Sequence, residues 1–408
     1  MPEDIKEIEN QNLDLSAEGV EEENEEFQPF DPEKISIDTK PITMDTCLRR
    51  LEQGTIILNP DFQRNEVWTM EKKCQLIESL MLKIPIPMFY VSADEKGHYY
   101  VVDGLQRLST IRSFVLGDEY LKTKNPDLKG NGFELEDLEF WGKSYNTLTF
   151  NKLPINIQNR ILETGFTFTI INPGTPEEVK RNIFKRINTG GEPLTPQEIR
   201  HALYIGESTE LLLRLSKREE FLKATSYSVK SNRMMDRELI LRFLAFTVRS
   251  YTNYPKNNDM DTFLSDTMRI INIMPGLNGK EGAKLFKDGI SKDDVLINDI
   301  SKLEELFIKA MDRTKIIFGE HSFRKSYPGR RRTPINKALF EVWSTLLAKL
   351  SDVEFENLTN NKEHLIDKYK GMLEENIFNF VISRDSLKVL SVKDRYEKLT
   401  DLIKEFTK

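Results

Sequence analysis

The 408-residue sequence lacks long apolar runs, since no stretch of about 18 consecutive apolar residues occurs in it. Its first residues, MPEDIKEIEN, are acidic and polar, without the apolar segment of a secretory signal. Cysteine is scarce as well, because only Cys47 and Cys74 are present and no C-x-x-C pair occurs. We therefore expect no membrane span, no secretory signal, no disulfide framework and no cysteine zinc site, and we expect a cytoplasmic location.

Histidine is also rare, and the four histidines are scattered without an H-N-H-like cluster: His98, His201, His321 and His364. The sequence therefore shows no residues for metal-dependent nuclease chemistry of that type. His201 either points into a site or is packed inside the protein, and packing is the commoner outcome for a single histidine in a helix.

Negative charge is concentrated at one end of the chain. Residues 1–28 contain eleven acids and one base, a net charge of −10, which leaves +3 for the remainder of a chain whose total is −7. Such a segment repels itself and buries little, so we predict a disordered acidic tail. A solubilising leader is the simplest interpretation, and a tail that binds a partner or mimics DNA is the alternative.

The remaining sequence is rich enough in apolar (38%) and aromatic (10%) residues to form cores. Short strand patterns alternate with helices from Phe30 to about Tyr204, and helical periodicity dominates from Glu207 onward. We predict an α+β protein with three parts: a disordered tail (1–28), a small mixed α/β domain (29–205) and an all-helical domain (206–408).

The sharpest local motif is Val101-Val102-Asp103-Gly104-Leu105-Gln106-Arg107. Two β-branched residues lead into an Asp-Gly turn and a helix begins at once, so backbone N–H groups and the positive end of a helix dipole are exposed. An anion such as phosphate fits there, and Arg107 can add a bidentate contact. Asp103 would repel a bare phosphate and suits a metal ion, a sugar hydroxyl or a water. A purely structural turn explains the junction equally well.

Two further segments carry arginines beside loops. Asn59-Pro60-Asp61-Phe62-Gln63-Arg64 precedes Trp68, and Phe184-Lys185-Arg186-Ile187-Asn188-Thr189-Gly190-Gly191 joins a helix end to a glycine-rich connection. Binding groups often lie on loops. Taken singly, Arg64 also fits a surface salt bridge, and Arg186 fits a partner of the helix dipole.

Four segments in order resemble the N-terminal domain of GmrSD-type restriction proteins, part of the wider ParB-like and sulfiredoxin-like superfamily. They are NPDFQRNEVW, KCQLIESLMLKIPIPMFYV, VVDGLQRLSTI and IFKRINTGGEPLTPQEIRHALY. The resemblance covers about Asp38 to Tyr204, and the stretches MDRELILRFLAF and NKALFEVW are similar to the helical part that often follows. Several relatives carry a fused HNH nuclease domain, and we expect a stand-alone form without one.

The resemblance implies a ParB/sulfiredoxin-like fold that binds a nucleoside triphosphate and hydrolyses it in bacterial defence against foreign or modified DNA. We expect Mg²⁺ to assist, with Asp103 holding the metal ion or orienting the attacking water. The family motif D-G-Q-Q-R falls on Asp103, Gly104, Gln106 and Arg107, with Leu105 in place of the first glutamine. Leucine cannot form that glutamine's hydrogen bonds, so hydrolysis is expected to weaken if that residue orients water. The implied catalytic residues are Asp103, Gln106 and Arg107, with Asp103 also the metal ligand. The implied nucleotide-binding residues are Phe62, Arg64, Gly104, Arg107, Arg186, Asn188 and Gly191.

A second basic stretch, Phe323-Arg324-Lys325-Ser326-Tyr327-Pro328-Gly329-Arg330-Arg331-Arg332, holds five bases in ten residues. Basic residues interleaved with aromatics are typical of nucleic-acid contacts, here Arg324, Lys325, Arg330, Arg331 and Arg332. A solvated loop, or a contact with nucleotide phosphates, accounts for the same stretch.

Three functions therefore remain open at the level of sequence. The first is a Mg²⁺-assisted nucleoside triphosphatase, a hydrolase acting in phage defence. The second is a ParB-like protein that binds or nicks DNA. The third is a non-catalytic nucleotide sensor that regulates a partner nuclease. All three place the chain away from membranes.

Overall fold

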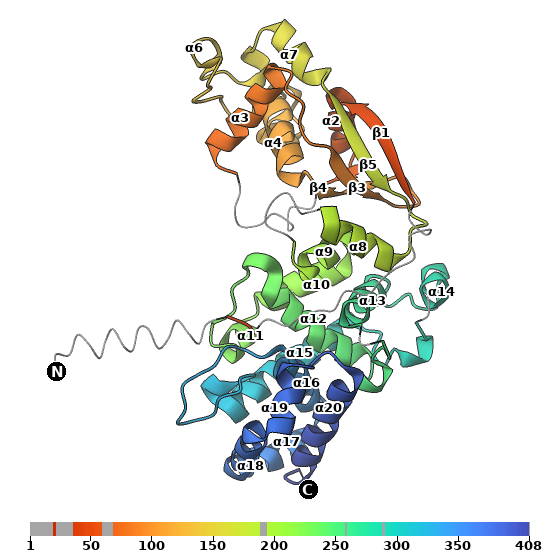
Figure 1. Ribbon diagram of the computed structural model, residues 1–408, viewed down its shortest axis with the longest axis vertical. Coiled ribbons are helices and arrows are strands. Elements are labelled where there is room, and N and C mark those ends of the chain that lie inside the picture. The colour runs from red at the N-terminus through yellow and green to blue at the C-terminus, as the bar shows by residue number, and fades with distance from the viewer. Residues whose placement is uncertain are drawn as a thin grey trace, which may run out of the picture. The chain divides into compact units, whose positions relative to one another are not determined.

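The computed structural model describes residues 19–21, 36–58, 68–187, 194–257, 259–287 and 290–407 (Figure 1). Contacts divide the chain into two compact units, Phe30–Leu203 and Tyr204–Lys408, and residues 19–21 belong with the second. Most of the predicted acidic tail, residues 1–18 and 22–28, lies outside the described residues. Among the described helices, none combines the length and apolar content that a membrane crossing requires.

The first unit is built on a mixed five-stranded sheet of order β1-β5-β3-β4-β2. Strand β3 is antiparallel to β4 and parallel to β5, β2 is parallel to β4, and β1 is antiparallel to β5. The strands are β1 (Ile37–Thr43), β2 (Ile56–Ile57), β3 (Phe89–Ala93), β4 (Tyr99–Asp103) and β5 (Gly165–Ile171). This small mixed sheet, followed by helices, confirms the predicted α+β class.

The helices of this unit begin where local sequence signals place them. Thr43 and Thr69 cap the first and second long helices, each accepting a hydrogen bond from the backbone three residues on. Figure 1 shows α3, α4 and α7 together on one side of the sheet. The helices are α2 (Met44–Glu52), α3 (Met70–Met81), α4 (Leu105–Leu116), α5 (Asp118–Thr123), α6 (Gly142–Tyr145), α7 (Ile155–Leu162), α8 (Glu177–Ile187) and α9 (Pro196–Leu203).

Aromatic packing and one buried carboxylate hold these elements together. The ring of Phe89 lies 5.4 Å from that of Phe166 and 5.3 Å from that of Phe168, which ties β3 to β5. On α3, the buried carboxylate of Glu78 accepts hydrogen bonds from the backbone N–H groups of residues 139–141 at 2.8–3.0 Å. Its burial is thereby compensated, and the segment leading into α6 is tied to α3.

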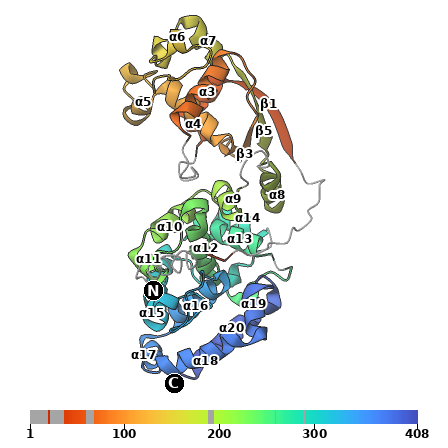
Figure 2. The same ribbon diagram turned by 60° about the vertical axis from the view of Figure 1, so that its left-hand side comes forward.

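The second unit is helical, and in its described part only single-residue bridges of Ile335 with Val20 and with Arg324 have strand character. Helix α12 is buried along nearly its whole length and packs against α10, α13, α15 and α16 (Figure 2). Most of its buried side chains are apolar, and among the charged ones Glu238 and Arg242 have partners of opposite charge. The helices are α10 (Glu207–Ser216), α11 (Glu219–Ala224), α12 (Met235–Val248), α13 (Met260–Asn272), α14 (Lys280–Lys287), α15 (Ile300–Phe318), α16 (Lys337–Lys349), α17 (Asp352–Asn360), α18 (Lys362–Glu374), α19 (Asn376–Ser383) and α20 (Val389–Lys404).

Candidate functional site

The predicted strand–turn–helix junction is present at the end of β4. Strand β4 ends at Asp103, Gly104 adopts φ 93° and ψ 11°, and α4 starts at Leu105. Only glycine suits this position, because the left-handed conformation disfavours a side chain and an added Cβ would lie 2.2 Å from Cδ1 of Phe89. The backbone bend that the motif predicted is therefore enforced by packing as well as by conformation.

The first turn of α4 has no side-chain cap. The first intrahelical bond runs from the N–H of Leu108 to the carbonyl of Gly104 at 2.9 Å. The preceding N–H groups of Leu105, Gln106 and Arg107 therefore have no partner within the helix, and helix ends of this kind are satisfied by water or a ligand. Together with the positive end of the helix dipole, they make the junction suited to an anion.

Arg107 is held firmly at this junction. Its Nη2 donates to Oδ2 of Asp103 at 2.8 Å and to the carbonyl of Met88 at 3.3 Å, and its Nη1 donates to the carbonyl of Pro87. The guanidinium carbon lies 4.7 Å from the centre of the Phe89 ring, and the side chain is only 12% exposed. Arg107 thus fastens the start of α4 to the start of β3.

These contacts also affect the pKa of Arg107 and the number of its N–H donors that are still available. Burial lowers the pKa of the Arg107 guanidinium, and the charge of Asp103 together with their hydrogen bond partly reverses that shift. Of the five N–H donors of a guanidinium, three are engaged in these bonds. Two donors remain to contact a ligand without breaking the bonds that fix the side chain.

The residue that departs from the family motif faces the interior. Leu105 is 6% exposed, whereas Gln106 is partly exposed. An apolar side chain is the expected choice at a buried position without polar partners. The exposed side of the junction therefore presents Asp103 and Gln106, and the replacement of glutamine by Leu105 alters the core beneath it.

The second predicted element, with Phe62 and Arg64, lies outside the described residues. The direction of the strand before it is defined, because β2 is parallel to β4 and pairs Ile57 with Tyr100. The chain therefore leaves β2 toward the same edge of the sheet at which Asp103 and Gly104 lie.

The third predicted element starts farther away. Strand β5 is parallel to β3, which is antiparallel to β4, so α8 follows β5 at the sheet edge opposite to Asp103. Arg186 is exposed in the last turn of α8, while Asn188 and Gly191 lie outside the described residues. The chain returns in α9, which packs against α8 and against β4. The role of Arg186 remains a prediction.

Helix α9 contributes two buried polar residues that the sequence did not single out, Gln197 and Arg200, beside His201. Gln197, Arg200 and His201 are each 0% exposed, and Oε1 of Gln197 accepts a hydrogen bond from Nε of Arg200 at 2.9 Å. The burial of His201 agrees with the packed alternative. The signal was present in the sequence, because the spacing i, i+3, i+4 puts all three on one helix face.

The predicted nucleic-acid residues lie in the second unit and differ in accessibility. Arg324 is 1% exposed and donates to the carbonyls of Thr333 and Thr225 and to the hydroxyl of Ser228. Burial lowers its pKa to about 10. Arg324 is therefore a structural residue rather than a nucleic-acid contact, whereas Arg330 and Arg331 are exposed.

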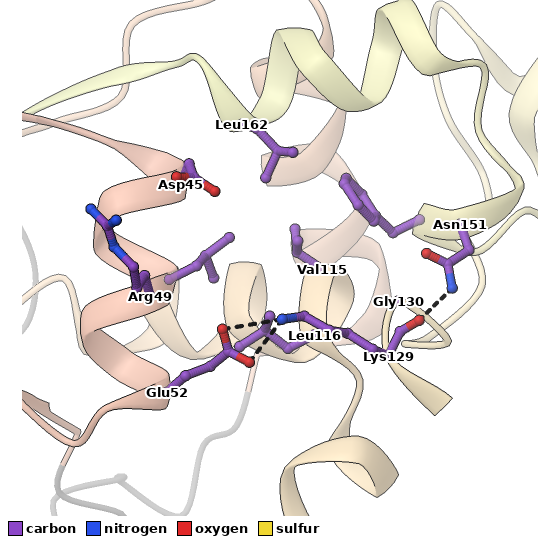
Figure 3. Close-up of a pocket in the computed structure, with 11 residues that line it drawn as sticks. Asp45, Arg49, Glu52, Val115, Leu116, Lys129, Gly130, Asn151 and Leu162 are labelled. Atoms are coloured by element: carbon purple, nitrogen blue, oxygen red, sulfur yellow. Dashed lines mark hydrogen bonds and ion pairs between the residues drawn. The ribbon is translucent and has the colours of Figure 1, made fainter. Parts of the chain in front are cut away.

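A separate pocket of about 340 Å³ lies at the other end of α4 (Figure 3). Its floor includes Leu48, Val115 and Leu116, and at its rim Lys129 pairs with Glu52 at 2.9 Å. Eleven residues separate Leu116 from Leu105, about 16 Å along a helix. The pocket is thus distinct from the junction.

Metal-binding side chains are sparse in the part of the chain that the structure describes. No group of three or more His, Cys, Asp or Glu side chains there is arranged to hold a metal ion. Mg²⁺ does not require such a group, since it is commonly held by one or two carboxylates together with substrate phosphates. Asp103 is 36% exposed and uses Oδ2 for Arg107, so a single carboxylate of this kind fits that mode.

Comparison with protein families gives one match. Residues 47–205 match the family model described as the GmrSD restriction endonuclease, N-terminal domain. The matched range contains the β4–Gly104–α4 junction and α9, and it confirms the resemblance that the four sequence segments indicated. No curated protein and no solved structure matches the chain.

Proposed function

The chain carries an N-terminal domain of the GmrSD restriction endonuclease family, and on that premise we propose that it acts in bacterial defence against foreign or modified DNA by binding a nucleoside triphosphate. The observation that carries this proposal is the uncapped start of α4 at Gly104, beside the Asp103–Arg107 pair. A positive helix end that lacks its own cap is a natural position for a phosphate.

We assign a role to each group at this site. The N–H groups of the first turn of α4 bind phosphate oxygens, and Arg107 adds its two remaining donors. Gln106, partly exposed in the same turn, orients the attacking water. Asp103 holds Mg²⁺, which neutralises charge on the phosphate oxygens when bound.

The buried position of Leu105 bears on whether this chain hydrolyses its nucleotide. Its side chain is 6% exposed, on the interior side of the junction. A group on that side is poorly placed to orient a water at the exposed helix end. We therefore favour a working nucleoside triphosphatase over a sensor without catalysis, and regulation of a partner nuclease remains a separate prediction.

Calorimetric titration with ATP, GTP, CTP and UTP, each with and without Mg²⁺, tests the proposal. We expect at least one nucleotide to bind wild-type protein, with tighter binding in Mg²⁺. Asp103→Asn keeps an oxygen that accepts the Arg107 hydrogen bond but removes the charge. This variant should bind nucleotide without Mg²⁺ at least as tightly as wild type, because the repulsion of phosphate is gone, and should lose the Mg²⁺ effect.

Phosphate release measures the catalytic part. Gln106→Ala should lower the rate about 10²-fold, because the attacking water loses the group that orients it, with little change in nucleotide affinity. Arg49→Ala, which removes an exposed arginine of α2, is the matched control and should behave as wild type. Absence of nucleotide binding by wild-type protein, with or without Mg²⁺, would remove the proposal altogether.

A further inference from the structure

Residues 19–21, within the acidic N-terminal sequence, are docked on the helical unit. The N–H of Gly19 donates to the carbonyl of Ser228 at 2.9 Å, and the N–H of Ile335 donates to the carbonyl of Gly19 at 3.1 Å. The N–H of Glu21 donates to the carbonyl of Ile335 at 2.8 Å, which completes a parallel bridge between Val20 and Ile335. The segment is thus bound on two sides by backbone hydrogen bonds.

The side chain of Glu21 makes the contact specific. One carboxylate oxygen accepts from Nζ of Lys325 at 2.7 Å and from Nδ2 of Asn336 at 2.8 Å. Glu21 is 24% exposed and Lys325 is 22% exposed, so this ion pair is partly shielded from water. Partly shielded pairs are screened less by salt than pairs on the open surface.

Lys325 belongs to a basic loop, residues 325–332, that we name the arginine loop. Arg330 and Arg331 are exposed, and Arg332 pairs with Glu320 at 3.2 Å. Arg330 and Lys370 lie 5.9 Å and 5.6 Å from the centre of the Tyr327 ring. Basic residues clustered in one loop, two of them exposed, are typical of a surface that contacts a nucleic-acid backbone.

The sequence around the docked segment is strongly acidic. Five further acids lie within five residues of Glu21 in sequence: Glu18, Glu22, Glu23, Glu25 and Glu26. The charge of this sequence is therefore opposite to that of the arginine loop.

We propose that the arginine loop binds the phosphate backbone of duplex DNA and that the docked segment competes with DNA for it. In this arrangement the carboxylate of Glu21 occupies, at Lys325, the position that a DNA phosphate takes in the bound state. While the segment is docked, DNA binds through the other cations of the arginine loop, and release of the segment frees Lys325 for one further phosphate contact. The proposal is independent of the nucleotide site in the first unit.

Fluorescence anisotropy with a labelled 20-base-pair duplex, between 50 and 200 mM salt, tests this competition in the full chain. Gly19→Pro removes the N–H that bonds to Ser228 and cannot adopt the φ of +94° found at this residue, yet leaves the net charge unchanged. We expect it to bind DNA about three- to tenfold more tightly than wild type at 50 mM salt. The slope of log affinity against log salt should steepen by about 0.9, the value for one added phosphate contact.

Two further variants separate docking from general charge. Glu21→Gln keeps the backbone bridge but frees Lys325, and it should steepen the slope by the same amount. Arg330→Ala combined with Arg331→Ala should flatten the slope by about 1.8 and weaken binding in both the wild-type and Gly19→Pro backgrounds.

Three results would overturn the proposal: no DNA binding by any of these proteins, equal affinities of wild type, Gly19→Pro and Glu21→Gln, or an affinity and salt slope that do not change when both arginines are lost. Nucleotide titration of the same variants should match wild type, so that failure here is distinguishable from failure of the nucleotide site. Thermal unfolding checks that each variant is folded.

Discussion

In the helical unit the carboxylate of Glu341 is 0% exposed and bonded to two arginines, whereas in the first unit Asp103 is 36% exposed and bonded to one. Glu341 accepts from Nη1 of Arg242 at 3.0 Å and from Nη2 of Arg395, and both guanidiniums are buried. These residues lie on α16, α12 and α20, so the cluster joins three helices that are distant in sequence.

The cluster extends to a second carboxylate. Glu238 lies 3.5 Å from Nε of Arg242 and 2.8 Å from Nζ of Lys337. Every carboxylate in this cluster has a cationic partner, as the cost of burying charge demands. At the junction, by contrast, one pair sits beside uncapped N–H groups and keeps unused donors. Buried carboxylates that each have a cationic partner support the fold, whereas a charged pair at a partly exposed position with unused donors is suited to a ligand.

Among the variants that test this contrast, the largest loss of folding stability is expected for Glu341→Ala. It leaves Arg242 and Arg395 buried without their shared carboxylate, and removing one partner of a buried ion pair costs about 3–5 kcal/mol. Urea unfolding of the second unit measures it. Glu320→Ala is the control, because this carboxylate is 57% exposed and its pairs with Lys315 and Arg332 should contribute about 0–1 kcal/mol. Equal losses in the two variants would contradict the contrast.

A smaller loss is expected at the junction for Gly104→Ala. The new Cβ meets the Phe89 ring and the residue keeps a positive φ, so we expect destabilisation of the first unit by about 2–4 kcal/mol. Gly165→Ala in β5 is the matched control, since nothing lies within 4 Å of its Cβ and its φ needs no glycine. If the two variants unfold at the same urea concentration, then neither the packing against Phe89 nor the positive φ requires glycine at residue 104.

The smallest effect on stability is expected for Glu52, whose burial lies between that of Glu341 and that of Asp103. Burial raises the pKa of its carboxyl, but hydrogen bonds from Tyr120 at 2.7 Å and from Lys129 at 2.9 Å outweigh burial and lower it overall. A lowered pKa in the folded state means that the stabilisation is present above the ordinary glutamate pKa of about 4.3 and is lost as pH falls through the folded value. Glu52→Gln should therefore cost about 0.5–1 kcal/mol at pH 7 and nothing at pH 3.

Thermal unfolding of wild type and Glu52→Gln between pH 3 and 7 measures this difference. A gap that stays constant across the range would mean that the hydrogen bonds, rather than the charge of Glu52, stabilise the rim of the pocket in Figure 3.

Much of the first unit was predictable because its signals are local. Thr43 and Thr69 mark helix starts, and the Asp103–Gly104 turn marks the junction, since caps and positive φ depend on a few neighbouring residues. Strand β1 is less evident from its sequence, because Pro41 interrupts a strand pattern. The structure tolerates Pro41 because β1 is at the edge of the sheet.

The charged residues were less predictable, because their environment depends on distant parts of the chain. The sequence grouped Arg324 with Arg330 and Arg331 as one basic run. Arg324 instead donates to Ser228, 96 residues away, and is buried, while its two neighbours in the run are exposed. No local pattern distinguishes the three, since burial and pairing are non-local.

The amino-acid order alone was therefore sufficient for the α+β class, the resemblance to the GmrSD N-terminal domain and the bend at Gly104, all of which rest on short-range hydrogen bonding, backbone conformation and apolar spacing. The tertiary structure determined the environment of each charged residue. Arg107 joins α4 to β3, Arg324 is buried in the interior, and Glu21 pairs with Lys325. The reason is that the free energy of a charged group depends on the water it loses and the partners it gains, and both come from residues far along the chain.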